Sequence, residues 1–274
     1  MKKFLLSIPL MLSFELRSEV LVDSVHSFSE GRPEEEHLLH LNSGRVVFVD
    51  QSYTSEDFTP GETVEIEINN KNRLEAATLL DSPPQNFSGE FVEKRNAQDK
   101  ATVLPSLSRA RSIFYGMNRS YKSNTECTDR AHVWAYEEWR KHGLVSQKMF
   151  MFFTNTYIRR YNYHWWFHVT PYVLVGSGST EYMMDRRYTS GPRLRKTWSD
   201  IFIRSKRSCP VTTYAHYRRN KNGVEHCFHV KSNMYNRLPY HVRMQEDYGR
   251  VQTRFSTSEV NFSYRAFTRR GLRQ

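Results

Sequence analysis

The chain has 274 residues, with 40 Lys and Arg against 29 Asp and Glu, and a formal net charge of +11. Residues 1–100 have a net charge of −8 and residues 101–274 one of +19, and the length allows one sizeable domain plus a small one. A basic part of this size suggests nucleic acid or an anionic surface as partner. No ribonucleoprotein, zinc-knuckle or helix-turn-helix pattern accompanies it, which argues against the common nucleic-acid modules.

Residues 1–20 have the pattern of a signal peptide. Lys2 and Lys3 precede an apolar stretch of 11 residues, Phe4 to Phe14, which fits a signal peptide and is too short to span a bilayer. We therefore expect a secreted protein, periplasmic or extracellular. No small-x-small cleavage site follows, and no other segment is apolar enough to be a membrane span.

Residues 21–80 predict a small, acidic, mainly-β domain. Gly44 to Asp50 and Gly61 to Asn69 have strand patterns, and the second alternates strictly between apolar residues and glutamates. Residues 81–106 contain Pro83-Pro84, Asn86, Gly89 and mixed charges, which is typical of a linker. Residues 107–274 then form the catalytic domain in this interpretation.

A helix is predicted to begin near Cys127 and to end at Gly143. Ala131, Trp134, Ala135 and Trp139 recur at helical spacing, and Ser123, Asn124 or Thr125 could each cap its start. A cysteine in the first turn lies where the helix dipole favours a thiolate. The alternative, a buried structural cysteine, fits its polar neighbours less well.

Three strands are predicted after this helix: Met149–Phe153, Trp165–Val175 and Glu181–Tyr188. They place His168 on one strand and Asp185 on its antiparallel neighbour. Cys127, His168 and Asp185 thus have the order of a nucleophile, a base and the residue that orients the base. A simple five-residue hairpin loop sets Asp185 opposite Pro171, about 10 Å from His168 along the strand, so a surface carboxylate paired with Arg186 or Arg187 is an equal alternative.

The other two cysteines admit two interpretations. Cys209 and Cys227 are 18 residues apart and form a disulfide if the export interpretation holds, with Cys127 left free. Cys209 with His226, Cys227 and His229 would supply zinc ligands instead. Residues 226 and 227 point to opposite faces of a strand, so the disulfide is favoured and no metal is expected.

The motifs resemble those of the bacterial protein-glutamine glutaminase family. Glu126-Cys127-x-x-Arg130-Ala131-His132-Val133-Trp134, Trp165-Trp166-x-His168-Val169-x-Pro171, Met184-Asp185, Gly191-Pro192 and Trp198-x-Asp200-x-Phe202-Ile203 follow in the family's order. The resemblance covers most of residues 100–240. It implies an α+β, papain- or transglutaminase-like fold, with the Cys-bearing helix packed on an antiparallel sheet and the small β domain before it. It also implies a triad of Cys127, His168 and Asp185, and an N-terminal propeptide that covers the active site.

The expected activity is therefore hydrolysis of the side-chain amide of protein-bound glutamine through a cysteine thioester, without a cofactor. Backbone amides at the helix start are the expected oxyanion donors, with Ser123 or Asn124 as side-chain candidates; Trp165 and Trp166 are candidates for substrate binding. A transglutaminase or cysteine protease with the same triad, a permanent accessory N-terminal domain, and a non-catalytic basic binding module are the alternatives. The expected partners are exposed glutamines of proteins and the acidic prodomain, for a monomer that binds no nucleic acid and inserts into no membrane.

Overall fold

The structure, a computed structural model, describes residues 18–80, 91–93, 101–118, 125–177, 180–205 and 207–271. Of residues 91–93 and 268–271 it describes the backbone alone. Most of the expected signal peptide, most of the expected linker, and both Ser123 and Asn124 lie outside the described residues. Among the described residues, no helix is long and apolar enough to cross a membrane.

The acidic part of the chain forms a five-stranded antiparallel sheet, here called the N-terminal sheet. Its strands follow the order β3-β2-β1-β4-β5. They are β1 (Glu19–Ser29), β2 (His37–Leu41), β3 (Val46–Val49), β4 (Thr63–Ile68) and β5 (Leu74–Leu80). The alternation predicted for Gly61 to Asn69 is present in β4, where Val64, Ile66 and Ile68 are buried and Glu65 is exposed.

The basic part is built on a seven-stranded sheet, here called the large sheet, with the order β11-β10-β9-β8-β13-β12 and with β7 paired to β9. Most of its pairs are antiparallel, while β7–β9 and β12–β13 are parallel. The strands are β7 (Val103–Leu104), β8 (Gln147–Phe153), β9 (Phe167–Val175), β10 (Thr180–Met183), β11 (Arg193–Leu194), β12 (Val211–Thr212) and β13 (Cys227–Ser232). The mixed α+β fold expected from the sequence is confirmed.

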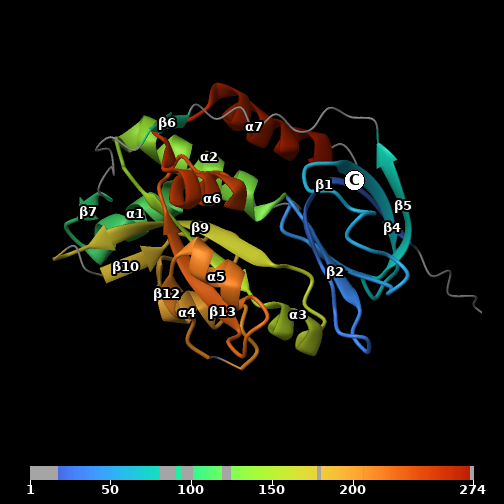
Figure 1. Cartoon of the computed structure of the whole chain (residues 1–274). Coiled ribbons are helices and arrows are strands. Elements are labelled where there is room, and N and C mark those ends of the chain that lie inside the picture. Colours follow the sequence, from blue (N-terminus) through green and yellow to red (C-terminus); the bar gives the residue numbers. More distant parts are fainter. Residues whose placement is uncertain are drawn as a thin grey trace, which may run out of the picture.

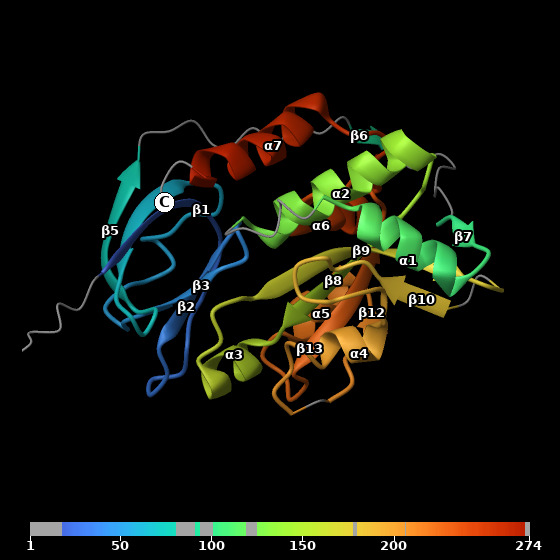
Figure 2. The ribbon, with the colours of Figure 1, turned by 180° about the vertical axis from the view of Figure 1, so that it is seen from behind.

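Helices cover both faces of the large sheet. Figures 1 and 2 show α1, α2 and α7 on one side and α4 and α5 on the other. The helices are α1 (Leu107–Gly116), α2 (Cys127–His142), α3 (Asn155–Tyr161), α4 (Arg195–Ser199), α5 (Tyr214–Asn220), α6 (Pro239–Tyr248) and α7 (Thr257–Gly271). Because helices lie on both faces, β8 is buried along almost its whole length, with Phe152 stacked on Tyr217 of α5 at 4.6 Å between ring centroids.

Two stretches of the expected linker are strands. Phe91–Glu93 forms β6 and pairs with β14 (Arg250–Gln252), and Val103–Leu104 forms β7 and pairs with β9. Composition predicts a loop here because proline, glycine and mixed charge dominate locally, whereas each pairing partner lies far along the chain. The start of the second part is therefore fixed to the large sheet before α1 begins.

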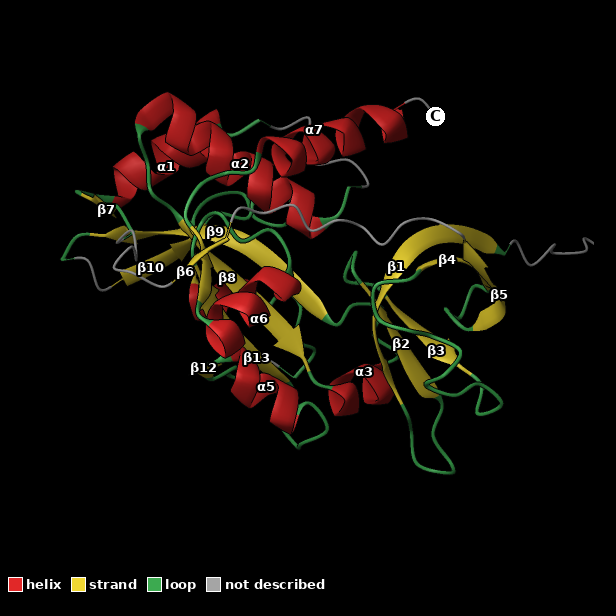
Figure 3. Cartoon of the chain, turned by 45° about the horizontal axis from the view of Figure 1, so that its top comes forward, coloured by secondary structure: helices red, strands yellow, loops and turns green. Residues whose placement is uncertain are grey.

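The N-terminal sheet packs against the segment that leads into β9. The Trp166 indole N–H donates to the Leu41 carbonyl at 2.9 Å, and His26 stacks on the same indole at 4.3 Å. Figure 3 shows the N-terminal sheet beside the strands of the large sheet, with α3 near β2. Gly44 lies at this contact: its φ is +96°, and a Cβ there would lie 3.1 Å from the Phe167 ring. Only glycine suits both conditions.

Candidate active site

Cys127 is the first residue of α2 and is 3% exposed. The helix ends at Gly143, which has a left-handed φ of 61°, as the sequence predicts. The predicted cap is wrong in its residue. Glu126 is the N-cap and makes no side-chain cap hydrogen bond, while the carbonyl and hydroxyl of Thr125 both accept from the Arg130 guanidinium. In the first turn of an α-helix the backbone N–H groups have no hydrogen-bond acceptor within the helix. Cys127 therefore lies beside backbone N–H groups that can bind a ligand.

His168 is the second residue of β9, and its Nε2 lies 2.7 Å from Asp185 Oδ2. Asp185 is 1% exposed and also accepts from the Trp198 indole N–H at 2.9 Å. Burial by itself raises the pKa of Asp185. The adjacent His168, by charge and hydrogen bond, together with the bond from Trp198, outweighs burial and lowers that pKa overall. Asp185 is thus a buried carboxylate held ionised by its two partners, not the surface carboxylate of the alternative interpretation.

The register explains how Asp185 reaches His168. Strand β10 ends at Met183, opposite Tyr172, and the Met184 N–H donates to the Pro171 carbonyl. The predicted strand to Tyr188 is therefore too long, and the pairing is shifted by one residue from that of a simple five-residue loop. Asp185 follows Met184 in the turn after the strand, near the level of Thr170, two residues from His168 along β9. Such diagonal neighbours are within side-chain reach.

Cys127 and His168 line one cavity of about 320 Å³. The Val169 backbone N–H donates to the Cys127 sulfur, which places the thiol beside the residue that follows His168. The cavity is lined by Cys127, Arg130, Asn162, Tyr163, His164, Trp165, His168, Tyr188, Phe202 and Arg204. All of these belong to residues 127–204, so no described residue of the N-terminal sheet lines it.

Burial raises the pKa of the Cys127 thiol to about 12, against the opposing effect of the Arg130 charge. The thiol therefore carries its proton at neutral pH in this state of the chain. The helix N-terminus alone does not deliver the thiolate that the sequence pattern predicts, because the cost of burying a charge exceeds the gain from the helix end.

The two tryptophans suggested as substrate-binding residues have different environments. Trp165 is half-buried and lines the Cys127 cavity. Trp166 is 2% exposed and contacts the N-terminal sheet instead. The sequence pattern does not indicate a role for the cavity residues Arg130, Tyr188, Phe202 and Arg204. Arg130 and Phe202 lie within the quoted motifs, but a motif alone does not show that a side chain reaches the nucleophile.

Cys209 and Cys227 form the expected disulfide, with their Cα atoms 5.1 Å apart, and Cys127 is free. The competing zinc arrangement finds no support. His226 bonds Ser205, His229 bonds Ser199 and the Cys209 carbonyl, and no group of potential metal ligands occurs among the described residues.

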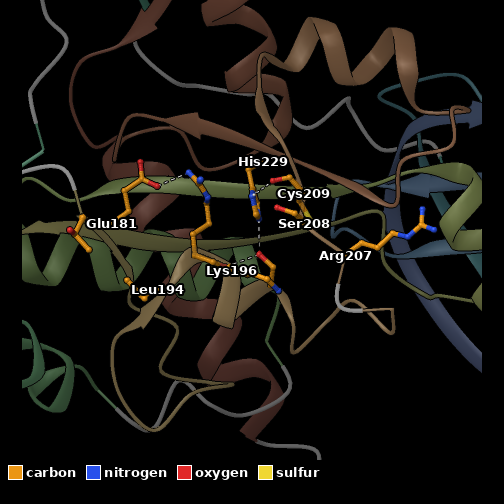
Figure 4. Close-up of a pocket in the computed structure, with 10 residues that line it drawn as sticks. Glu181, Leu194, Lys196, Arg207, Ser208, Cys209 and His229 are labelled. Carbon is orange, nitrogen blue, oxygen red and sulfur yellow. Dashed lines mark hydrogen bonds and ion pairs between the residues drawn. The ribbon is translucent and has the colours of Figure 1, made fainter.

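A second cavity, of about 340 Å³, lies beside this disulfide, and Figure 4 shows His229 directed toward Cys209 within it. Its only carboxylate among the lining residues, Glu181, is paired with Arg195 at 2.8 Å. His229 stacks on Trp198, which separates this cavity from His168. With its cysteine in a disulfide, this cavity offers no nucleophilic thiol.

Comparison with known proteins agrees with this geometry. Residues 106–202 match the model of a family described as glutaminase, and this stretch contains Cys127, His168 and Asp185. This segment is similar to the glutaminase family. The family resemblance inferred from the motifs is thereby confirmed.

Solved structures extend the likeness beyond the glutaminase segment. The crystal structure of a pro- protein-glutaminase matches with a TM-score of 0.53 at 12% identity, over 93% of this chain and 93% of that chain. The NMR structure of protein-glutaminase from Chryseobacterium proteolyticum matches with a TM-score of 0.37 at 14% identity, over 60% of this chain and 86% of that one. No curated protein matches the sequence. At such identities the first of these structures shows a shared fold over most of the chain.

Proposed function

We propose that the chain is a protein-glutamine glutaminase, which hydrolyses the side-chain amide of protein-bound glutamine to glutamate and ammonia. The observation that carries this proposal is one cavity with Cys127 at the start of α2 and His168 bonded to Asp185, within a glutaminase-family segment. The description of the matching fold as a pro- protein-glutaminase supports the same substrate.

In this proposal His168 acts through Nδ1, because Nε2 is bonded to Asp185. Asp185 holds the imidazole in the tautomer that leaves Nδ1 free of its proton. With the pKa of Cys127 raised to about 12, a preformed ion pair is disfavoured, so His168 takes the thiol proton as the sulfur attacks the carboxamide carbon. The first-turn amides of α2 stabilise the oxyanion.

The second half of the reaction returns the enzyme to its starting state. His168 gives its proton to the leaving nitrogen, ammonia departs, and a thioester joins Cys127 to the substrate side chain. Water then attacks the thioester carbonyl while His168 removes its proton. The carbon–sulfur bond breaks, glutamate is released, and the proton returns to the thiol. No metal or organic cofactor takes part in these steps.

We also propose that residues 21–80 are a prodomain of an exported protein. Its net charge of −8 complements the basic remainder, and its contact with Trp166 lies next to the cavity residue Trp165. No described residue of the N-terminal sheet lines the cavity. In this proposal the sheet inhibits the enzyme indirectly, by its contact with Trp166 beside the lining residue Trp165. The Cys209–Cys227 disulfide fits an oxidising compartment.

The test is ammonia release from a glutamine-rich protein, by the full chain and by the full chain cut within residues 81–90. We expect Cys127→Ala and His168→Ala to reduce the rate by on the order of 10³-fold or more, and Asp185→Ala by a smaller factor. His216→Ala, at an exposed histidine of α5, is the matched control. Mass spectrometry of the product distinguishes deamidation from peptide-bond cleavage and from cross-linking. Full activity of the Cys127 variant would refute the proposal.

A further inference from the structure

Arginine side chains gather around the cavity that contains Cys127. Arg130 and Arg204 line it, and Arg187 adjoins the lining residue Tyr188. The three come from different segments: α2, the turn after β10 and the loop after α4. None of them forms a salt bridge with a described residue, and Arg187 and Arg204 are exposed.

Two tyrosines hold these guanidinium groups. Tyr188 lies under Arg130 at 6.0 Å and Arg187 at 5.9 Å from its ring centre. Tyr161 lies under Arg160 at 5.4 Å and Arg204 at 5.6 Å. Stacking on an aromatic face orients the planar group while its N–H donors remain available at the edge. The stacking thus orients the exposed guanidinium groups of Arg187 and Arg204 beside the cavity.

Carboxylates of the chain offset this charge only in part: Glu126 and Asp185 act on the Cys127 thiol and Asp185 also interacts with Arg130, but neither lines the cavity. Its described lining residues include no Asp or Glu, and Asp185 behind His168 is already committed to His168 and Trp198. A cavity with arginines and no carboxylate favours an anionic ligand and disfavours a cationic one.

An acidic segment of the chain itself already lies against the neighbouring arginines. Glu30 and Glu35 share a cavity of about 430 Å³ with Arg159 and Arg160 of α3. Glu35 and Arg159 approach to 3.7 Å. This contact shows that an acidic stretch of polypeptide fits beside Arg160, whose partner on the Tyr161 ring is the cavity residue Arg204.

We propose that Arg187 and Arg204 select protein substrates in which Asp or Glu flanks the target glutamine. The inference rests on the proposed glutaminase function, for which it defines the substrate class. With the glutamine side chain at Cys127, flanking residues lie over the cavity rim, where guanidinium groups pair with carboxylates and repel Lys or Arg.

The experiment measures ammonia release from three blocked peptides of equal length, with one glutamine flanked on both sides by Glu, Ala or Lys. The enzyme is the full chain, intact and after cutting within residues 81–90. We expect kcat/KM to fall in the order Glu, Ala, Lys, by about tenfold overall at low salt and by much less at about 1 M salt, because exposed charges are screened.

Variants test whether these arginines are responsible. Arg187→Gln and Arg204→Gln should each reduce the Glu-to-Lys ratio of kcat/KM by about two- to fivefold. Arg204→Lys should retain most of the ratio. Arg219→Gln, at an exposed arginine of α5 outside the cavity lining, is matched in charge and should leave the ratio unchanged.

The outcomes separate the two proposals. If neither form of the enzyme releases ammonia from any peptide, the glutaminase function and the inference fall together. Release with equal kcat/KM for all three peptides overturns the inference and leaves the function standing. A preference for the Glu peptide that is unchanged in both Arg187→Gln and Arg204→Gln also overturns the inference, because other residues would then cause the preference.

Discussion

Trp198 is a positioning residue for the pair formed by His168 and Asp185. The indole is fully buried, and its N–H donates to the same Asp185 oxygen that bonds His168. A buried indole N–H requires an acceptor, and an ionised carboxylate is the strongest one available. The shared oxygen fixes the carboxylate, which in turn fixes the imidazole. The sequence motif contains Trp198 but does not indicate this role.

The first prediction at this scale concerns Trp198→Phe, which keeps an aromatic ring and removes the N–H. Losing one of the bonds that lower the pKa of Asp185 raises that pKa, so Asp185 is protonated at a higher pH. We expect the acid limb of the kcat/KM profile for ammonia release to move to higher pH. Trp139→Phe, at a tryptophan 40% exposed on α2, is the control. An unmoved acid limb would show that Trp198 only fills space.

The catalytic residues show what sequence establishes at this scale. Cys127 and His168 follow from a helix start and an aromatic strand, which are local patterns. The sequence does not decide whether Asp185 contacts His168 or lies at the surface. The answer depends on where β10 ends and on the length of the loop between β9 and β10. The environment of the thiol was not predictable, since burial of Cys127 comes from residues distant in sequence.

The first turn of α2 is held by a charged contact at Asp129. The carboxylate accepts from two nitrogens of Arg237, at 3.1 and 2.8 Å, and from the Ser263 hydroxyl of α7 at 3.0 Å. The Arg237 guanidinium also lies 4.5 Å from the Phe262 ring centre. Both charged side chains are largely buried. The turn that carries Cys127 is thereby fixed to the C-terminal helix.

Asp129→Asn should destabilise the fold strongly, by about 3–5 kcal/mol, because it leaves the Arg237 charge buried without its carboxylate. Urea unfolding measures the change. The double variant Asp129→Leu with Arg237→Met should recover much of the loss, since no uncompensated charge remains. Lys141→Gln breaks the more exposed pair with Glu137 on the same helix and should change stability by less than about 1 kcal/mol. Equal losses in the two single variants would contradict this account.

Elements whose signals are local were predictable. The helix from Cys127 to Gly143 and the strand within Gly61 to Asn69 follow from periodicity and a terminating glycine. The short strands Phe91–Glu93 and Val103–Leu104 do not, because their pairing partners are distant in sequence. The cap of α2 is missed for a different reason: the Arg130 guanidinium, five residues along the chain, binds Thr125, and no side chain caps the helix.

On the scale of the whole molecule, the contact between the N-terminal sheet and the rest is uncharged around Trp166, while the segment after β1 adds the ion pair between Glu35 and Arg159. His26 stacks on Trp166 and shares a 3.2 Å hydrogen bond between its Nε2 and the Tyr214 hydroxyl. His40 is 2% exposed near the same indole. The charge difference between the two parts guides their approach, while these apolar and neutral contacts hold them together. The acidic and basic composition was visible in the sequence, but the residues in contact were not.

Both interfacial histidines are held neutral. Burial lowers the pKa of His26 to about 4, against the opposing effect of the hydrogen bond that its Nδ1–H donates to the Asn42 side-chain oxygen, and the charges of Lys221, Arg243 and Arg218 lower it further. Burial also lowers the pKa of His40 well below its usual value. A histidine whose pKa is lowered in the docked state binds a proton more tightly in the undocked state. As the pH falls below about 6.5, the ordinary histidine pKa, protonation therefore shifts the equilibrium toward the undocked state. Acid should therefore loosen the N-terminal sheet.

The last prediction concerns the pH dependence of docking by the N-terminal sheet. After the chain is cut within residues 81–90, docking should weaken by about 2 kcal/mol between pH 7 and pH 5 through His26 alone. Size-exclusion chromatography measures how much of the N-terminal fragment separates, and ammonia release should rise with separation. His26→Gln cannot be protonated, so its docking should vary less with pH, whereas His216→Gln should behave like the parent. Fragments that remain together equally at both pH values would show that the apolar contact at Trp166 dominates, and that acid is no trigger for release.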